Sequence, residues 1–469
     1  MNAVPKELPT PTSPANDQII QFGRKIFQAI GQERPSAFSK NFWSGTMMEW
    51  SMKRPEFKIN MFRLVDVLPT LTTSAAIAKH VTEYLAGPAG KLSGILRWGA
   101  TVNPRSIRAH LTAFMVRKGV KEMAAQFIAG ASAERALPVL RRIRKDGLAF
   151  TVDLLGEFCV SEQEAVAYLN RYLEALTAIG KTVPTWKEGA ALVAGHSGEQ
   201  TPVCVSVKLS ALYSQTNVLN FDRSVAVLSE RLSQLARKAL EVNAQLYVDA
   251  EDSANNQIIY EVFERVFSDP EFKALPVPGI VVQAYARESR QIIERLIQFA
   301  RRRGSPIAIR LVKGAYLDYE TVVADQSNLP CPLFSRKEST DANYEELSRL
   351  LLDNTAVVLP AFGSHNVRSL SQACVYAEQN GIPKTAFELQ MLYGMAEPIA
   401  RAFSSEGYLV RLYVPLGEML PGMGYLVRRL LENTSNESFL RHTFFDANEV
   451  GDLLRAPTPE PQTPPSQSA

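Results

Sequence analysis

The sequence predicts an α/β fold, a (β/α)₈ barrel preceded by an all-helical region. Two observations support this prediction. From about residue 148 onward, eight short runs of β-branched and other apolar residues alternate with amphipathic helical stretches. Such alternation is typical of parallel strands joined by helical crossovers. Eight of these units fit the size of a (β/α)₈ barrel, and a doubly wound sheet is the alternative fold.

The part of the chain before the barrel divides into two segments. Residues 1–16 are rich in Pro, Thr and Ser and predict a disordered tail. Residues 17–145 carry apolar residues at helical spacing, broken at Pro55 and Pro69, and predict a helical domain. We find no catalytic motif in this domain and interpret its aromatic residues as packing.

Residues 146–445 form the predicted barrel. Its expected strands are residues 148–155, 203–209, 245–251, 279–285, 306–312, 355–363, 385–392 and 408–415. The helical stretches between them include residues 221–242, 287–303, 341–353, 367–380 and 395–405. Residues 446–469 read as a Pro-rich tail or linker, which indicates that another domain could begin where this sequence stops.

Composition argues against several classes of protein. The 469 residues carry a formal net charge of only +3, which gives no case for nucleic-acid binding. The four cysteines have no CxxC spacing, so we expect neither a disulfide framework nor a zinc site. We find no signal peptide and no apolar run long enough for a membrane span. We therefore expect a cytoplasmic protein, with at most a peripheral contact at the inner face of the cytoplasmic membrane.

Polar residues recur in or just after the predicted strands, although a barrel core is otherwise apolar. They are Asp153, Lys208, Asp249, Gln283, Arg310, Lys313, His365, Asn366, Gln390 and Tyr413. In a (β/α)₈ barrel the active site lies at the carboxyl ends of the strands. A buried pair that serves stability would explain any single position, but their recurrence on one rim favours a functional site.

The stretch YLVRRLLEN, residues 425–433, adds further cations. Tyr425, Arg428, Arg429 and Glu432 follow i, i+3, i+4, i+7 spacing and form one polar stripe of a helix. This stripe is either solvated surface or a double guanidinium clamp for a carboxylate or phosphate. Together with the cations of the strand ends, it predicts a basin for an anionic ligand.

Several motifs resemble the proline dehydrogenase family and occur in that family's order. They are VSVKLSAL (205–212), YVDAED (247–252), VVQAY (281–285), IRLVKGAYLD (309–318), SHN (364–366), FELQMLYGM (387–395) and YLVRRLLEN (425–433). The resemblance covers about residues 150–445 and is strongest to the proline dehydrogenase domain of bifunctional proline utilization A. The segments DLLGE (153–157) and RLVDVLPTL (63–71) also resemble that protein.

The resemblance implies a distorted barrel that holds FAD without a covalent link and oxidises L-proline to Δ1-pyrroline-5-carboxylate. Electrons would then pass to a quinone, commonly at the membrane. The sequence lacks the aldehyde dehydrogenase domain of proline utilization A, so it would be a truncated piece or a stand-alone enzyme. Residues 1–50 do not resemble the DNA-binding domain of some family members, so no transcriptional role is expected.

The residues that match the family's substrate site are Lys208, Leu311, Tyr316, Tyr413, Tyr425, Arg428 and Arg429. By this resemblance the two arginines would bind the substrate carboxylate, with the lysine as a third cation. Tyr413 and Tyr425 would wall the proline ring, Leu311 would pack on its apolar edge, and Tyr316 would shape the pocket. Glu157 would pair with Arg428 as a gate when the site is empty.

Asp249 and Arg310 match the family's active-site pair beside the flavin. The charge of Arg310 would favour the reduced flavin, and Asp249 would hold Lys208 or a flavin-side contact. The residues that match flavin positions are Gln283, Arg310, Val312, Lys313, Gly314, Ala315, Ser364, His365, Asn366, Gln390, Glu432 and Phe439. No side chain stands out as the base for the substrate amine, and we interpret His365 as a cofactor ligand.

Three alternative functions stay open. A Schiff-base lyase would use Lys208 or Lys313 as its nucleophile. A non-catalytic barrel would bind an anionic metabolite and scaffold a partner domain. Another flavin barrel, such as a folate reductase, would take electrons from a nicotinamide cofactor, although the arginine and tyrosine pairs favour a small amino acid as substrate.

Overall fold

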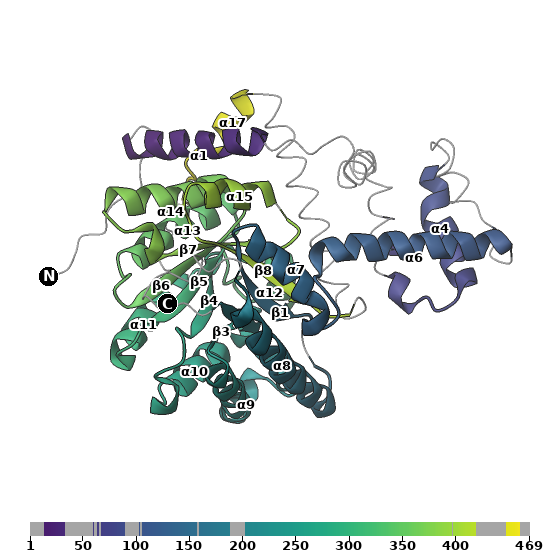
Figure 1. Ribbon diagram of the computed structural model, residues 1–469, viewed down its shortest axis with the longest axis horizontal. Coiled ribbons are helices and arrows are strands. Elements are labelled where there is room, and N and C mark those ends of the chain that lie inside the picture. The colour runs from purple at the N-terminus through teal and green to yellow at the C-terminus, as the bar shows by residue number, and fades with distance from the viewer. Residues whose placement is uncertain are drawn as a thin grey trace.

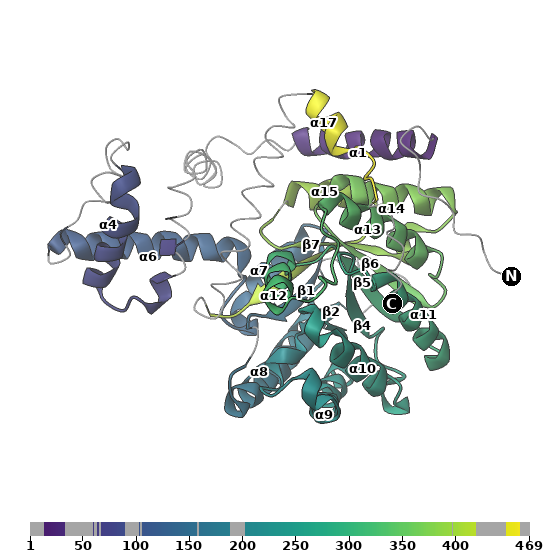
Figure 2. The same ribbon diagram turned by 180° about the vertical axis from the view of Figure 1, so that it is seen from behind.

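The core of the molecule is a closed barrel of eight parallel strands in the order β1-β2-β3-β4-β5-β6-β7-β8 (Figures 1 and 2). The computed structural model describes residues 14–32, 60, 63–64, 67–89, 103, 106–156, 159–187, 202–395, 397–418 and 447–459. Within these residues the helices that connect the strands surround the barrel (Figure 1). The prediction of a (β/α)₈ barrel is confirmed, and the doubly wound sheet is excluded.

Each predicted strand is present, with its ends shifted by a few residues. The strands are β1 (Ala149–Leu154), β2 (Val203–Val207), β3 (Ala244–Val248), β4 (Gly279–Gln283), β5 (Ile307–Val312), β6 (Val358–Gly363), β7 (Glu388–Leu392) and β8 (Val410–Leu416). Neighbouring strands pair in parallel around the whole circle, and β8 closes the barrel onto β1.

The connecting helices account for the amphipathic stretches of the sequence. They are α8 (Glu162–Thr182), α9 (Phe221–Glu241), α10 (Asn256–Phe267), α11 (Ser289–Arg303), α12 (Leu317–Ser327), α13 (Lys337–Leu352), α14 (Val367–Gln379) and α15 (Glu397–Ser405). Short 3-10 helices are η1 (Leu68–Thr70), η2 (Val183–Thr185), η4 (Leu209–Ala211), η5 (Val218–Asn220), η6 (Ser253–Asn255), η7 (Pro270–Phe272) and η8 (Lys384–Ala386).

Strand alternation divides the strand residues into two sets. Successive side chains of a strand point to opposite faces. One set is apolar and packs against the surrounding helices in the large hydrophobic core. The other set points into the barrel, where Cys204, Tyr247, Ala308 and Leu359 form a separate buried cluster near the amino ends of the strands.

An ion pair completes the interior at that amino end. Arg411 of β8 donates two hydrogen bonds to the carboxylate of Glu388 at the start of β7, both 2.9 Å long. Both residues are almost fully buried. A bidentate pair of this kind satisfies two charges that would be costly to bury alone.

The described part of the region before the barrel is mainly helical. Its helices are α1 (Pro14–Gln32), α4 (Ser74–Ala89), α6 (Ile107–Phe127) and α7 (Ala133–Lys145). Helices α4 and α6 pack on each other to one side of the barrel, and α7 packs against β1 and α8 (Figures 1 and 2). Among the described residues, no helix is both long and apolar enough to cross a membrane.

The two terminal segments meet on the outer surface of the barrel. Helix α1 packs across α14 and α15, and α17 (Ala447–Leu453) lies beside α1 (Figures 1 and 2). Leu454 is fully buried in the main core, beside Gly23 of α1. The predicted tail therefore differs from the structure at residues 447–454, because Leu454, with Val450 and Leu453, packs against the main core.

A single buried guanidinium joins these segments. Arg368 of α14 donates two hydrogen bonds to the carboxylate of Glu345 on α13, at 3.0 and 3.2 Å. It also donates to the side chain of Asn16 on α1 and to the backbone oxygen of Leu454, the latter at 3.1 Å. We call this group of four residues the terminal clasp.

Replacing Arg368 with methionine should open the terminal clasp and lower the free energy of unfolding by about 3–5 kcal/mol, because the Glu345 carboxylate loses its buried partner. We expect a lower Tm and faster tryptic cleavage at Arg24 and Lys25 of α1. The control is Arg401→Met, which removes an exposed pair with Glu397 on α15 and should cost at most about 1 kcal/mol. Equal effects of the two variants would argue against the clasp.

Candidate active site

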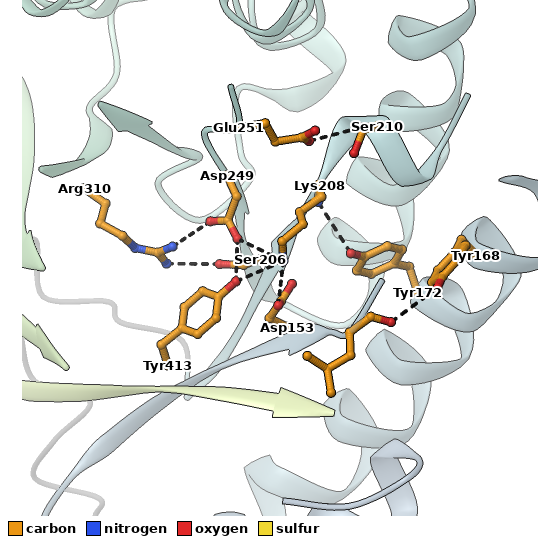
Figure 3. Close-up of polar contacts among 11 residues, drawn as sticks. Asp153, Tyr168, Tyr172, Ser206, Lys208, Ser210, Asp249, Glu251, Arg310 and Tyr413 are labelled. Atoms are coloured by element: carbon orange, nitrogen blue, oxygen red, sulfur yellow. Dashed lines mark hydrogen bonds and ion pairs between the residues drawn. The ribbon is translucent and has the colours of Figure 1, made fainter. Parts of the chain in front are cut away.

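Inward-pointing residues of five strands converge near the carboxyl end of the barrel (Figure 3). Four of them lie within strands, namely Asp153 of β1, Ser206 of β2, Arg310 of β5 and Tyr413 of β8. The other two directly follow a strand, Lys208 after β2 and Asp249 after β3. Asp153, Ser206, Asp249 and Arg310 are buried, and Lys208 and Tyr413 are partly exposed. We call these six residues the polar cluster.

Arg310 lies at the centre of the polar cluster. Its guanidinium donates to Asp249 Oδ1 at 2.7 Å and to Ser206 Oγ at 3.0 Å. It also lies 4.2 Å from the ring centroid of Tyr247 and 5.3 Å from that of Tyr413. Burial is the largest influence and acts to lower the pKa of Arg310, but Asp249 and the neighbouring groups together outweigh it and the pKa is raised. The side chain is therefore a fixed, buried cation.

Lys208 is the second cation of the polar cluster. Its Nζ donates to Asp153 Oδ2 at 2.6 Å and to the Tyr413 hydroxyl at 3.3 Å, and lies 3.9 Å from Asp249 Oδ2. The Tyr413 hydroxyl in turn donates to Asp249 Oδ2 at 2.7 Å. Two cations and two carboxylates thus form one connected group whose formal charges cancel.

The protonation of this group follows from burial and from its mutual charges. Burial raises the pKa of Asp153 to about 6; Lys208 acts to lower it and Asp249 to raise it. Burial acts to lower the pKa of Lys208, but Asp153 and Asp249 outweigh it and the pKa is raised. Lys208 therefore stays charged at neutral pH. Asp153 Oδ1 is buried and has no hydrogen-bond partner among the described residues.

Gln283, the last residue of β4, ties the loop after β3 to the loop after β5. Its Nε2 donates to the backbone oxygen of Glu251 at 2.7 Å, and its Oε1 accepts from the backbone N–H of Ala315 at 3.3 Å.

In the loop after β5, Gly314 has φ of +140°, and a Cβ there would lie 2.3 Å from the Tyr285 ring. A side chain at this position is excluded on both grounds. Lys313 donates to Asp341 on α13.

The ends of β6 and β7 present a second group of polar residues. His365 Nε2 accepts from the backbone N–H of Leu392 at 3.0 Å. Ser364 Oγ accepts from the N–H of Asn366 at 3.0 Å, and Asn366 caps α14. Gln390 donates to Glu388, and its buried Oε1 has no hydrogen-bond partner among the described residues. This region therefore offers a buried acceptor to a ligand.

The structure brings together four of the predicted site residues directly, namely Lys208, Asp249, Arg310 and Tyr413. Val312 is the last residue of β5 and shares the inward face with Arg310. Tyr316 is half-buried and immediately precedes α12. Glu157, Tyr425, Arg428, Arg429, Glu432 and Phe439 lie outside the described residues.

Leu311 lies apart from the other predicted site residues. It follows Arg310 in β5 and therefore points to the opposite face of the strand. Its side chain is fully buried in the main core between the strands and the surrounding helices. The structure does not bring Leu311 to the barrel interior, and its contact with a substrate ring stays a prediction that this strand geometry does not support.

Three contributors to the site did not stand out in the sequence. Ser206 and Tyr247 each contact Arg310, and Glu251 joins the loops after β2 and β4. The two-residue strand period counted back from Lys208 and Asp249 would have found Ser206 and Tyr247. Glu251 has no such signal because it lies in a loop.

Residues 136–442 match the family described as proline dehydrogenase, and residues 16–127 match the proline utilization A N-terminal domain. The chain belongs to the proline dehydrogenase family. Its barrel, preceded by a helical region, is the architecture expected for this family.

Relatives of this chain include longer proteins and proteins of barrel size. The bifunctional protein PutA of Escherichia coli (strain K12) is 32% identical over 73% of this chain and 26% of its own length. Proline dehydrogenase 1 of Bacillus subtilis (strain 168) is 26% identical over 70% of this chain and 93% of its own length. The chain thus spans about a quarter of the bifunctional relative.

A solved structure gives a further comparison. The crystal structure of proline utilization A from Bdellovibrio bacteriovorus, inactivated by N-propargylglycine, has a TM-score of 0.85 and 42% sequence identity. The match covers 97% of this chain and 46% of that chain. The likeness therefore includes the helical region as well as the barrel.

Proposed function

We propose that this chain oxidises L-proline to Δ1-pyrroline-5-carboxylate, the first step of proline catabolism, with FAD as hydride acceptor and a quinone as the next electron acceptor. The observation that carries this proposal is the polar cluster at the carboxyl end of a proline dehydrogenase barrel. It holds two cations, Arg310 and Lys208, in place through ion pairs in a largely buried environment. Charged groups stabilise a developing charge most strongly when they are preorganised and shielded from water.

The described residues fit a flavin. Gln390 has a buried carbonyl oxygen without a partner among them, and Arg310 has a buried Nε–H in the same state. These atoms suit a ligand with both donors and acceptors, such as an isoalloxazine ring. When bound, FAD supplies a two-electron acceptor that no side chain provides. We propose as its contacts Gln283, Arg310, Val312, Lys313, Gly314, Ala315, Ser364, His365, Asn366, Gln390, Glu432 and Phe439.

In this proposal Arg310 and Asp249 are the catalytic pair. Arg310 offers positive charge to the negative charge that develops during oxidation. Asp249 holds Arg310 through one carboxylate oxygen and the Tyr413 hydroxyl through the other. The pair therefore fixes both a cation and one wall of the substrate site before any ligand arrives.

For the substrate we propose a carboxylate clamp formed by Arg428 and Arg429, with Glu157 as the gate that pairs with Arg428. The polar stripe of the sequence supports the clamp. Lys208 would contribute mainly through its charge, because its Nζ already donates to Asp153 and Tyr413. Tyr413, Tyr425 and Tyr316 would surround the ring. Arg429→Met should then raise KM for proline and leave the flavin bound.

Further partners follow from the same proposal. The bifunctional relatives support an aldehyde dehydrogenase partner domain that would take the product onward. We also propose a cytoplasmic location with peripheral contact with the inner face of the membrane, where a quinone is accessible. These proposals rest on the family resemblance alone.

The Schiff-base lyase is the second candidate, and one observation bears on it. A Schiff-base lysine must lose its proton, and Asp153 and Asp249 keep Lys208 charged. Lys313 fits better, because burial lowers its pKa even though Asp341 acts in the opposite direction. Borohydride reduction in the presence of a keto acid would label Lys313 if this alternative were correct.

An absorption spectrum tests the proposed function directly. The purified protein should show flavin bands that bleach when L-proline is added without oxygen, and D-proline serves as the matched control. Bands that bleach only with a nicotinamide donor would favour a flavin reductase. A colourless protein that takes up no added FAD would overturn the flavoenzyme proposal.

A further inference from the structure

The backbone around Lys208 is held from two sides by buried side chains. The N–H of Lys208 donates to the hydroxyl of Tyr172 on α8 at 3.4 Å. Two residues later, the N–H of Ser210 in η4 donates to Oε1 of Glu251 at 3.1 Å (Figure 3). Tyr172 is fully buried and Glu251 is 3% exposed. Both contacts are made within the protein, so the fold itself positions the backbone on either side of Leu209.

Glu251 links more than one loop. Its side chain reaches the loop after β2, while its backbone oxygen accepts from Gln283 at the end of β4. Ser210 in turn contacts the loop after β1, because its backbone oxygen accepts a hydrogen bond from the N–H of Cys159 in that loop at 3.4 Å. Four consecutive strand ends are therefore joined through Glu251.

An ionised carboxylate at the position of Glu251 lowers the stability of the fold, because it is buried. Burial raises the pKa of Glu251 to about 7, with Lys208 acting to lower it and Asp252 to raise it. The carboxylate oxygen accepts a backbone N–H where an amide oxygen would do the same. Buried groups that reduce stability in this way are concentrated at functional sites.

We propose that Glu251 is a positioning residue for proline oxidation: it fixes the backbone at Ser210 and thereby holds the Lys208 ammonium against Asp153 and Tyr413. This inference rests on the proposed function. A displacement of about 1 Å at a positioned group can cost roughly 100-fold in rate. Release of the η4 backbone would move Lys208, and Lys208 donates to the hydroxyl of Tyr413, a wall of the substrate site.

The test compares two variants of Glu251 with a neighbouring control, all as holoenzyme. Glu251→Ala removes the acceptor, whereas Glu251→Gln keeps an oxygen of the same reach. The control is Asp252→Asn, because the Asp252 carboxyl accepts a hydrogen bond from Asn255, whereas the Ser210 N–H donates to Glu251. Hydrogen exchange of the peptide spanning residues 205–213 is read beside kcat and KM for proline.

We expect Glu251→Ala to speed exchange at Ser210 and to lower kcat/KM by about 10- to 100-fold. Glu251→Gln should restore both values to within about threefold of the wild type, and Asp252→Asn should leave both unchanged. Wild-type exchange and kcat/KM in Glu251→Ala would overturn the proposal, and so would an equal loss in Glu251→Gln.

Melting curves supply a readout that needs no activity and does not depend on Glu251→Ala being folded. The pKa of Glu251 in the folded state, about 7, exceeds its ordinary value. Its stabilising contribution is therefore complete below the unfolded pKa and is lost as pH rises through 7. The groups that face it with charge are Lys208 and Asp252, and Gln283 and Ser210 are neutral. The difference in Tm between Glu251→Gln and the wild type should therefore shift in favour of the variant from pH 5 to pH 8. A difference in Tm that does not change with pH would contradict a buried Glu251.

The two proposals fail in different ways. If the wild type does not bleach or turn over with proline, the proposed function fails while the exchange contrast at Ser210 still stands. If the wild type oxidises proline and the three variants show no contrast in exchange or rate, only the role of Glu251 fails.

Discussion

Replacement of Arg310 by methionine is expected to abolish measurable proline oxidation and to lower the free energy of unfolding by about 3–5 kcal/mol. The variant leaves Asp249 buried without its partner at 2.7 Å and removes the donor to Ser206. It also removes the guanidinium stacked over Tyr247. Activity should fall by roughly a thousandfold or more, because a preorganised charge is lost from a dry site.

Arg411→Met is the matched control for this prediction. It breaks a second buried arginine–carboxylate pair, with Glu388, at the opposite end of the barrel. It should lower Tm by a similar amount and leave most of the activity of the folded enzyme. Chemical denaturation, kcat/KM and the flavin-to-protein absorbance ratio separate the two effects. If Arg411→Met inactivates as severely as Arg310→Met, the loss would reflect stability and not chemistry.

Replacement of Lys208 by methionine should reduce kcat/KM by at least about 100-fold and make stability more sensitive to pH. Lys208 acts to lower the pKa of Asp153, so its removal should raise that pKa beyond the present value of about 6. A carboxyl with a raised folded pKa loses its stabilising contribution as pH rises through that pKa. The Tm deficit of Lys208→Met against wild type should therefore grow between pH 5 and pH 8.

A double variant checks the cause of this effect. Lys208→Met with Asp153→Asn removes the carboxyl that would take up the proton. Its Tm deficit should be smaller at pH 8 than that of Lys208→Met alone, while kcat/KM stays low. A deficit that does not change with pH in either variant would show that Asp153 and Lys208 are not coupled.

Much of the barrel could be predicted from the sequence, because strand–helix alternation follows from local patterns of apolar residues. The same patterns located Lys208, Asp249, Arg310 and Tyr413 at strand ends, where the topology brings them together. The two-residue period of β5 should also have excluded Leu311 from the interior. Resemblance to a family placed it in the site, whereas strand geometry places it in the outer core.

Other parts of the site could not be predicted because they depend on tertiary packing. Tyr172 lies on a helix and Glu251 in a loop, and each meets the backbone beside Lys208 only when neighbouring strands and helices have packed together. The docking of Leu454 beside α1 is of the same kind. No local pattern reports a contact between residues so far apart along the chain.

The terminal clasp has a consequence for the synthesis of the chain. Asn16 is 352 residues before its partner Arg368, and Leu454 lies a further 86 residues along. A ribosome therefore releases α1 long before the barrel surface that buries it exists, and releases Leu454 only after all eight strands. The apolar face of α1 has no barrel surface to pack on until α14 and α15 have been translated. The contacts of Leu454 with Arg368 and beside Gly23 then complete the clasp only when the nascent chain has been extended past Leu454.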